Sequence, residues 1–255
     1  MPIEIRQFPC LSDNYAYLVR DSETGAVAAI DTPDAKAINA ALDAQGWALT
    51  HIFNTHWHPD HTGGNLALKD RWECAIIGPK DEAAKIPGID AQADEGDLIR
   101  LGASTAIVHA TPGHTLGHII YHFTDDGAAF VGDTIFALGC GRLFEGTPEQ
   151  MWASLSKIAA MPPETKLYCA HEYTEANARF AVTLDAGNSA LAQRYQSIIG
   201  MRAAGMPTVP STVADELATN PFLRAGAAEI QTALALKDPD PVAAFAEIRR
   251  RKDRF

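Results

Sequence analysis

The spacing of hydrophobic and polar positions changes character along this chain. Up to about Glu172, short runs rich in β-branched and aromatic residues alternate with Gly, Pro, Asp and Asn, which is typical of strands joined by turns. Helical spacing predicts two helices among them, at 34–45 and at 148–160, and Thr147 is expected to cap the second before Pro148. The runs predict strands at 15–20, 26–31, 51–54, 75–77, 106–109, 119–123, 128–131 and 166–169. This mixture favours a layered α/β domain.

After Tyr173 the strand-like alternation fades and alanine-rich segments with helical spacing replace it. Prolines separate these segments, so several short helices are expected. They are predicted at 174–183, 189–204, 212–217, 225–235 and 241–252. The 255 residues therefore divide into an α/β domain over 1–172 and a helical domain over 173–255.

Composition narrows the class of protein. A content of 47% hydrophobic residues in 255 supports a sizeable core, and no apolar run approaches the roughly 20 residues that span a bilayer. Met1–Leu11 lacks a basic start followed by an apolar stretch, and the four cysteines form no CxxC pair, so we expect a cytoplasmic monomer with reduced thiols. The net charge of −11 is carried by the part up to Glu172, which disfavours nucleic acid and acidic membranes as partners.

Four metal-ligand types lie within six residues, directly after the predicted strand at 51–54. Pro59 and the following double glycine disfavour a regular helix through the cluster, so its ligands are expected to project from a turn. The first two could face one cation and the last two another, unlike the pair of histidines four apart on a zincin helix. The cluster comprises His56, His58, Asp60 and His61.

Three further ligand types each follow a predicted strand: His114, Asp133 and His171. Strand ends gather at one edge of a sheet, so these side chains could converge on the cluster. For His118, support of a neighbouring ligand and a purely structural role are both open. Packing or surface roles are expected for the histidines inside strand runs, His51, His109 and His122.

The order His56-x-His58-x-Asp60-His61, then His114, Asp133 and His171, resembles the signature of the metallo-β-lactamase superfamily. Within it, the chain is similar to the hydroxyacylglutathione hydrolase (glyoxalase II) family over nearly its whole length. The resemblance implies a four-layer αββα sandwich that carries the metals, followed by a helical domain that helps to hold glutathione. The motifs that carry this likeness are Ser12-Asp13-Asn14-Tyr15, Thr111–Thr115, Gly132–Phe136, Gly139–Arg142, His171–Thr174, Asn220–Phe222 and Arg249–Asp253.

The resemblance also implies how the ligands are shared between two metal ions. One ion would take His56, His58 and His114, the other Asp60, His61 and His171, with Asp133 between them. Imidazoles and carboxylates without thiolates suit Zn²⁺, Fe²⁺ or Mn²⁺, and zinc is the expected metal. Asp60 and Asp133 would be catalytic in the sense that, as ligands, they position a hydroxide that bridges the metals.

The activity implied is hydrolysis of S-(2-hydroxyacyl)glutathione thioesters, chiefly S-D-lactoylglutathione, to glutathione and D-lactate, which detoxifies methylglyoxal. The bridging hydroxide would attack the thioester carbonyl, and the thiolate can leave without a dedicated general acid because its conjugate acid has a pKa near 8.5. For the end of the chain, a solvated helix terminus is the alternative. The implied glutathione contacts are Arg142, Tyr173, Arg249 and Lys252.

This chain departs from the family pattern at two positions near the expected substrate. Arg142 stands where the family often has lysine, and Phe144 where a tyrosine hydroxyl commonly contacts glutathione. The second change removes one hydrogen bond, worth roughly 0.5–1.5 kcal/mol. We expect it to alter affinity rather than the reaction.

Three other functions are open on the sequence alone. A mononuclear iron dioxygenase of glutathione persulfide would consume oxygen; the second set of ligands and the long helical segment favour hydrolysis instead. A dinuclear nuclease would need a basic, aromatic surface that the acidic first domain lacks. A non-catalytic metal-binding module is the third alternative, although an open dinuclear site is not expected in a purely structural role; full turnover by a normally folded Asp133→Ala would contradict the catalytic assignment.

Overall fold

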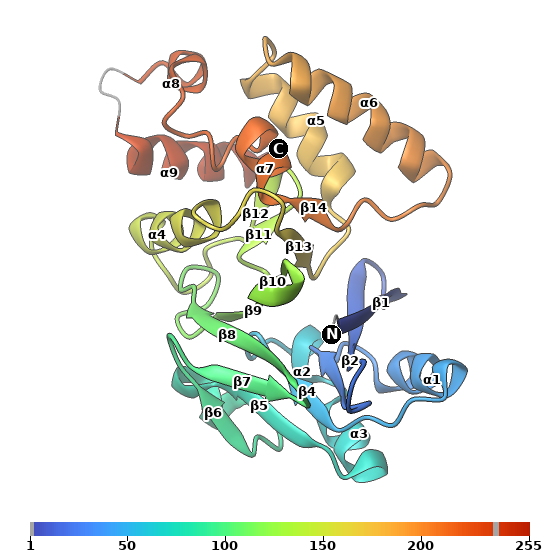
Figure 1. Cartoon of the computed structure of the whole chain (residues 1–255). Helices are drawn as coiled ribbons and strands as arrows, with labels where there is room; N and C mark the ends of the chain where they lie inside the picture. Colours follow the sequence, from blue (N-terminus) through green and yellow to red (C-terminus); the bar gives the residue numbers. More distant parts are fainter. Residues whose placement is uncertain (1–2, 237–239) are drawn as a thin grey trace. The chain divides into compact units, whose positions relative to one another are not determined.

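The computed structural model describes residues 3–236 and 240–255, which form two compact units (Figure 1). The first unit contains the segments up to Ala110 and Leu116–Gly132. The second contains Thr111–Thr115 and the chain from Asp133 onward. The domain boundary predicted after residue 172 marks a change in sequence pattern and does not follow the limits of these two units. It stays a prediction.

The first unit begins with a mixed sheet of strands in sequential order. β1 (Ile3–Cys10), β2 (Asn14–Asp21) and β3 (Val27–Ile30) run antiparallel; β4 (His51–Phe53), β5 (Ala75–Pro79) and β6 (Ala91–Ala93) continue from β3 in parallel. Parallel neighbours need crossover connections, which α1 (Ala35–Gln45), α2 (Pro59–Thr62) and α3 (Asn65–Trp72) supply up to β5; a 3₁₀ helix at Lys80–Lys85 lies between β5 and β6. The ligand cluster therefore lies in the crossover that follows β4.

A second sheet in the first unit packs on the face of the first sheet that α1 and α3 leave uncovered. It consists of β7 (Leu98–Leu101), β8 (Ser104–Ala110), β9 (Ile119–Phe123) and β10 (Ala128–Gly132), each antiparallel to the next. Alternation along β2 sends Leu18 into the helix-covered core, while Tyr17 points the other way and meets Phe130 at 5.4 Å between ring centres. Phe53 likewise stacks on Tyr121 at 5.2 Å.

Each strand predicted in the first unit is present, and the expected α1 is capped by Asp34. The expectation of no helix in the ligand cluster is corrected: Pro59–Thr62 forms one helical turn, because proline is well tolerated at the first helical position. β1, β6 and β7 were not predicted. β1 contains Pro9, which an edge strand tolerates, and β6 is a mostly exposed strand of only three residues.

The second unit is mostly helical. α4 (Pro148–Ala159) begins at the predicted cap Thr147, whose hydroxyl accepts from Gln150 in a capping box. It is followed by β13 (Lys166–Cys169), α5 (Thr174–Leu184), α6 (Ser189–Ala203), β14 (Ser211–Thr212), α7 (Val213–Thr219), α8 (Ala228–Leu234) and α9 (Pro241–Lys252). β13 and β14 pair antiparallel, and a short hairpin, β11 (Ile135–Phe136) with β12 (Gly139–Cys140), lies directly after Asp133. The five predicted helices correspond to α5–α9.

Two further observations follow from the described residues. The four cysteines are free and buried, as expected for reduced thiols. None of the helices within 3–236 and 240–255 combines the length and the apolar character that crossing a membrane requires.

Candidate metal centre

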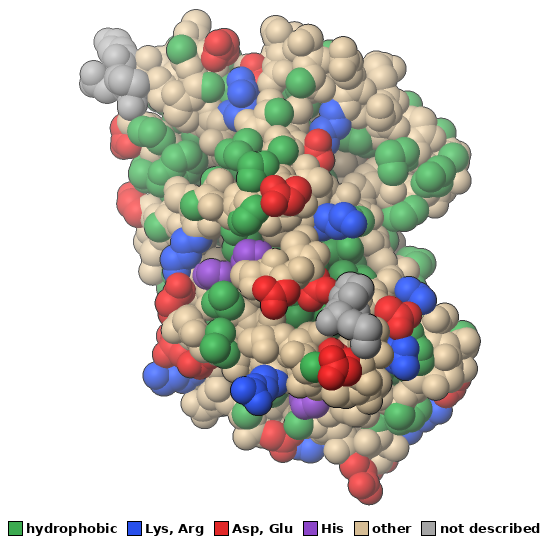
Figure 2. Space-filling view, in the orientation of Figure 1, with side chains coloured by type: hydrophobic (Ala, Val, Ile, Leu, Met, Phe, Trp, Pro, Cys, Tyr) green, Lys and Arg blue, Asp and Glu red, His purple; other side chains and the backbone are tan. Residues whose placement is uncertain are grey.

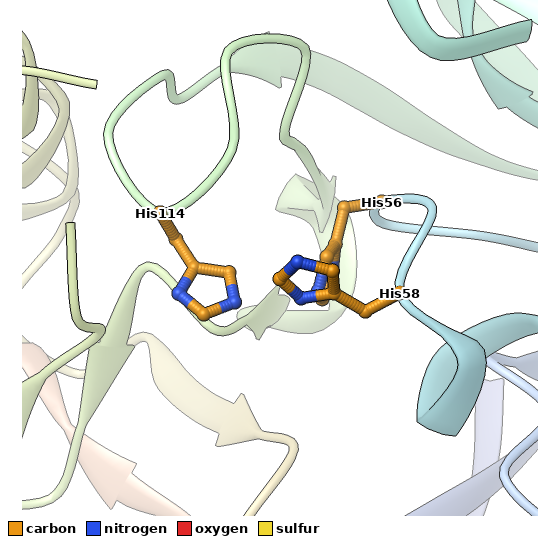
Figure 3. A group of neighbouring side chains, drawn as sticks. All are labelled: His56, His58 and His114. Carbon is orange, nitrogen blue, oxygen red and sulfur yellow. The ribbon is translucent and has the colours of Figure 1, made fainter. Parts of the chain in front are cut away.

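The first group of predicted ligands lies on a turn at the carboxyl end of β4. Two buried amides hold this turn: Asn54 donates to the carbonyl of His61 at 3.0 Å, and Asn65 donates to Asn54 Oδ1 at 2.8 Å. His56 and His58 project from the same turn (Figure 3). Because the amide network is buried and bonded, it restricts the directions in which these histidines point.

His61 is oriented by a carboxylate behind it. Its Nδ1 lies 2.8 Å from Asp31 Oδ2, and Asp31 also accepts from the backbone N–H and the hydroxyl of Thr55, both at 2.8 Å. The proton therefore resides on Nδ1, and Nε2 presents the lone pair that a metal binds. Asp31 follows β3 at φ 55°, in the left-handed region that aspartate tolerates better than most residues.

Asp60 is oriented by the side chain of Asn14, which donates to its Oδ2 at 3.1 Å. The same oxygen lies 3.5 Å from Nε2 of His61. A carboxylate oxygen and an imidazole nitrogen at this separation can bind one ion together. The geometry within the first unit thus agrees with the expected sharing of Asp60 and His61.

His56 and His58 form the other pair on the turn. His56 Nε2 and His58 Nδ1 lie 3.0 Å apart, close to the roughly 3.3 Å between two nitrogens bound tetrahedrally to zinc. Thr55 Oγ1 lies 3.0 Å from His56 Nδ1, and His118 stacks on the His56 ring at 4.8 Å. His118 is fully buried against a predicted ligand, which is compatible with both of its open roles.

Glu82 fixes the path of the ligand turn from outside the cluster. Its carboxylate accepts from the backbone N–H groups of Trp57 and Gly117, each at 2.9 Å, although it is 97% buried. A side chain at Gly117 would meet Glu82 at 2.5 Å, so this approach requires glycine. Glu82 thereby ties the turn to the loop that precedes β9.

The second group of predicted ligands lies in the second unit. His114 Nε2 is 3.3 Å and His171 Nε2 is 3.5 Å from the same oxygen of Asp133, Oδ2. All three residues are buried. One carboxylate oxygen that faces two imidazoles from different loops has the arrangement expected of a ligand between two ions.

A backbone carbonyl orients His114. Its Nδ1 donates to the carbonyl oxygen of Arg142 at 2.9 Å, so Nε2 presents the lone pair. Gly141 packs against both Asp133 and His114: a Cβ at this position would lie 2.0 Å from the Asp133 carbonyl oxygen and 3.2 Å from the His114 ring. The edge of the His114 ring meets the exposed ring of Phe144 at 5.2 Å.

Aromatic rings hold His171. Tyr173 stacks on it in parallel, at 4.8 Å between ring centres, and Phe136 meets it edge-on at 5.8 Å. Tyr173 is 37% exposed, so it presents a face to solvent beside His171. This position agrees with the expected substrate contact without testing it.

The basic residues expected to bind glutathione differ in surroundings. Arg142 is exposed, whereas Arg249 is 94% buried and donates to the Cys140 carbonyl at 2.9 Å. Lys252 is half-buried; burial, together with the neighbouring guanidinium groups of Arg249, Arg142 and Arg179, lowers its pKa to about 8. A cation surrounded by cations favours an anionic ligand.

Cys140 is not suited to nucleophilic chemistry, and the histidines inside strands lie outside the ligand set. Burial raises the pKa of the Cys140 thiol to about 11, so the thiol stays neutral. Burial and the neighbouring His109 lower the pKa of His122 to about 4, and burial lowers the pKa of His51. All three histidines lie in strands, as expected.

The structure brings the predicted ligands together within each unit: His56, His58, Asp60 and His61 in the first, and His114, Asp133 and His171 in the second. Their convergence into one site stays a prediction. Sequence reasoning did not select Asp31 or Glu82, and it named Asn14 only within the motif Ser12-Asp13-Asn14-Tyr15, without a role. Asp31 carries the signal used for Asp133, a carboxylate directly after a buried strand; nothing local distinguishes Glu82 from a surface acid.

Comparison with protein families divides the chain at the start of the helical segment. Residues 12–171 match the model described as the metallo-beta-lactamase superfamily. Residues 172–255 match the model described as the hydroxyacylglutathione hydrolase C-terminus. The expected fold class is confirmed.

Among known proteins, the hydroxyacylglutathione hydrolase of Hyphomonas neptunium is 55% identical over 253 residues, which are 99% of this chain and 98% of that protein. The hydroxyacylglutathione hydrolase of Chelativorans is 52% identical over the full length of both. Among solved structures, ETHE1 from Myxococcus xanthus has a TM-score of 0.68 at 26% identity and covers 98% of both chains. TTHA1623 in a di-iron-bound form, at 22% identity and a TM-score of 0.63, covers 86% of this chain and 100% of its own and shares the fold.

Proposed function

Because the chain belongs to the hydroxyacylglutathione hydrolase family of the metallo-β-lactamase superfamily, we propose that it hydrolyses S-(2-hydroxyacyl)glutathione thioesters, chiefly S-D-lactoylglutathione. The enzyme is a metal-dependent hydrolase. The products would be glutathione and D-lactate. The observation that carries the proposal is that hydrogen bonds orient predicted ligands of both groups. Asp31 orients His61, Asn14 orients Asp60, and the Arg142 carbonyl orients His114.

The donor set fits a pair of divalent ions. The set of His56, His58 and His114 and the set of Asp60, His61 and His171 each offer three ligand atoms, and Asp133 offers one oxygen to two histidines. The absence of thiolates from the set favours a catalytic over a closed structural zinc site. Zinc is the metal we propose, and iron or manganese suits the same donors.

Two such ions would supply a water activated near neutral pH and a Lewis acid for the thioester carbonyl. The chain's own residues orient the metal-binding histidines. Asp31 and the Arg142 carbonyl hold the protons of His61 and His114 on Nδ1, which keeps Nε2 unprotonated and directed. A thiolate leaving group, with a conjugate-acid pKa near 8.5, needs no proton donor from the protein.

Substrate binding would use the cations of the second unit. Lys252 and Arg142 would attract the carboxylates of glutathione, and Tyr173 would offer an aromatic face beside His171. Figure 2 shows acidic side chains among the basic ones of the described residues on the visible face. The monomeric state, the cytoplasmic location and the absence of nucleic-acid and membrane partners stay predictions.

The decisive experiment measures thiol release from S-D-lactoylglutathione by the purified protein, before and after exhaustive treatment with a metal chelator. We expect turnover that disappears with the metal and returns when Zn²⁺ is added. Activity that survives complete metal removal would contradict the proposal. Oxygen consumption with glutathione persulfide, or RNA cleavage without thioester hydrolysis, would select one of the alternative functions.

A further inference from the structure

Glu82 is a buried carboxylate that binds two separate segments of backbone in the first unit. Its Oε2 accepts the N–H of Trp57, and its Oε1 accepts the N–H of Gly117, both at 2.9 Å. Trp57 lies between the predicted ligands His56 and His58. Because a buried carboxylate needs hydrogen bonds to both of its oxygens, and 3% of Glu82 is exposed, its position depends on both segments.

The 3₁₀ helix that carries this carboxylate, Lys80–Lys85, also holds the side chain of Trp57. The ammonium group of Lys85 lies over the Trp57 ring at 4.4 Å, and the edge of one ring meets the other between Trp57 and His58, 4.7 Å apart at their centres. The helix begins directly after β5 and is followed by Ile86, which is packed in the core. One anchored segment thus holds both the backbone and the ring of Trp57.

The segment that starts at Gly117 contacts the ligand turn as well. The His118 ring stacks on the ring of His56 at 4.8 Å, and the N–H of Ile119 donates to the carbonyl of Thr55 at 2.9 Å. The carboxylate therefore holds the start of a segment that packs on one predicted ligand, in addition to the backbone between the two.

We propose that Glu82, assisted by Lys85, is a positioning residue for one of the two metal ions, the one expected at His56 and His58. By holding the backbone between these histidines, it keeps His56 Nε2 and His58 Nδ1 at the 3.0 Å that suits a shared ion. The inference rests on the proposed function, because it takes both histidines as metal ligands. Both carboxylate oxygens are needed, since an amide offers one acceptor oxygen and turns an NH₂ group toward the other N–H.

The test compares Glu82→Gln with Asp81→Asn, a matched control at an exposed position of the same 3₁₀ helix. Zinc is titrated into the metal-free protein in competition with a chromophoric chelator, while ¹⁵N NMR follows the histidine rings. For Glu82→Gln we expect His56 and His58 to bind zinc about 10-fold more weakly, with little change at His61. Asp81→Asn should match wild type at all three histidines.

A readout without metal separates positioning from a general loss of the fold. In the metal-free protein, the N–H groups of Trp57 and Gly117 should exchange slowly with solvent, and Glu82→Gln should accelerate this exchange more than exchange in the neighbouring strands. Unchanged exchange, unchanged zinc affinity, or an equal loss of affinity at all three histidines would overturn the proposal.

A second variant decides the case if Glu82→Gln does not fold. Lys85→Met removes the cation over the Trp57 ring at an exposed position, and Lys80→Met, at the other end of the same helix, is its control. We expect Lys85→Met to weaken zinc binding by the His56–His58 pair about two-fold and Lys80→Met to leave it unchanged; equal affinities in the two variants would overturn the proposal.

The zinc measurements need no thioester. A protein that binds two zinc ions but hydrolyses no glutathione thioester would refute the proposed function, while the comparison of zinc affinities would still decide the role of Glu82.

Discussion

The two groups of ligands are built in opposite ways. In the first unit, four ligands fall within His56–His61 on one crossover turn, and side chains of the same unit, Asp31 and Asn14, orient two of them. In the second unit, the three ligands come from separate loops, and their support is a backbone carbonyl and aromatic rings. The contrast lies in the kind of support: polar side chains from several elements hold the dense motif, whereas a backbone carbonyl and aromatic rings hold the dispersed residues.

The largest effect is expected from Asp133, which faces two histidines of the second group. Asp133→Asn keeps the shape but removes the charge, and we expect kcat/KM to fall on the order of 10³-fold, with loss of bound zinc. Turnover and metal content are measured on protein whose melting temperature is checked. Asp125→Asn, on an exposed turn, serves as the control. Full turnover by a normally folded Asp133→Asn would remove this residue from the catalytic site.

An intermediate effect is expected from Asp31, the carboxylate behind His61. Asp31→Ala leaves the buried Thr55 groups without their acceptor, so we expect about 10- to 100-fold weaker zinc binding and a loss of about 1–3 kcal/mol in the free energy of unfolding. Asp31→Asn should be milder, since its amide oxygen can still accept and asparagine tolerates the left-handed backbone. Chelator competition and urea unfolding measure the two quantities. Equal zinc affinity in all three proteins would show that the first group needs no such support.

The smallest effect concerns substrate binding by Lys252. Because its pKa is lowered to about 8, the cation is present at pH 7 and is lost as the pH rises through 8. KM for the thioester should therefore rise several-fold between pH 7 and pH 9, while kcat changes less. Lys252→Arg keeps its charge over this range and should flatten the profile. A steep rise of KM that persists in Lys252→Arg would assign the titration to another group.

Much of the fold could be predicted from local pattern. The apolar runs that became β2, β4 and β9 and the cap of α4 at Thr147 are encoded by neighbouring residues, as are the helices after residue 173. The helical turn at Pro59 was missed because a four-residue helix has too little periodicity to recognise. β6 and β7 were missed for a similar reason: both are short and largely exposed, so their residues do not alternate clearly.

What the sequence by itself determined is the chemistry: seven ligand-type residues, their order and the motifs of one enzyme family. Tertiary structure alone decided which groups orient those ligands, because Asp31 meets His61 across 30 positions and Glu82 reaches the backbone of Trp57 across 25. The physical reason is that ligand identity is a property of each side chain. Its orientation depends on hydrogen-bond partners that only the packing of sheets and helices brings within about 3 Å.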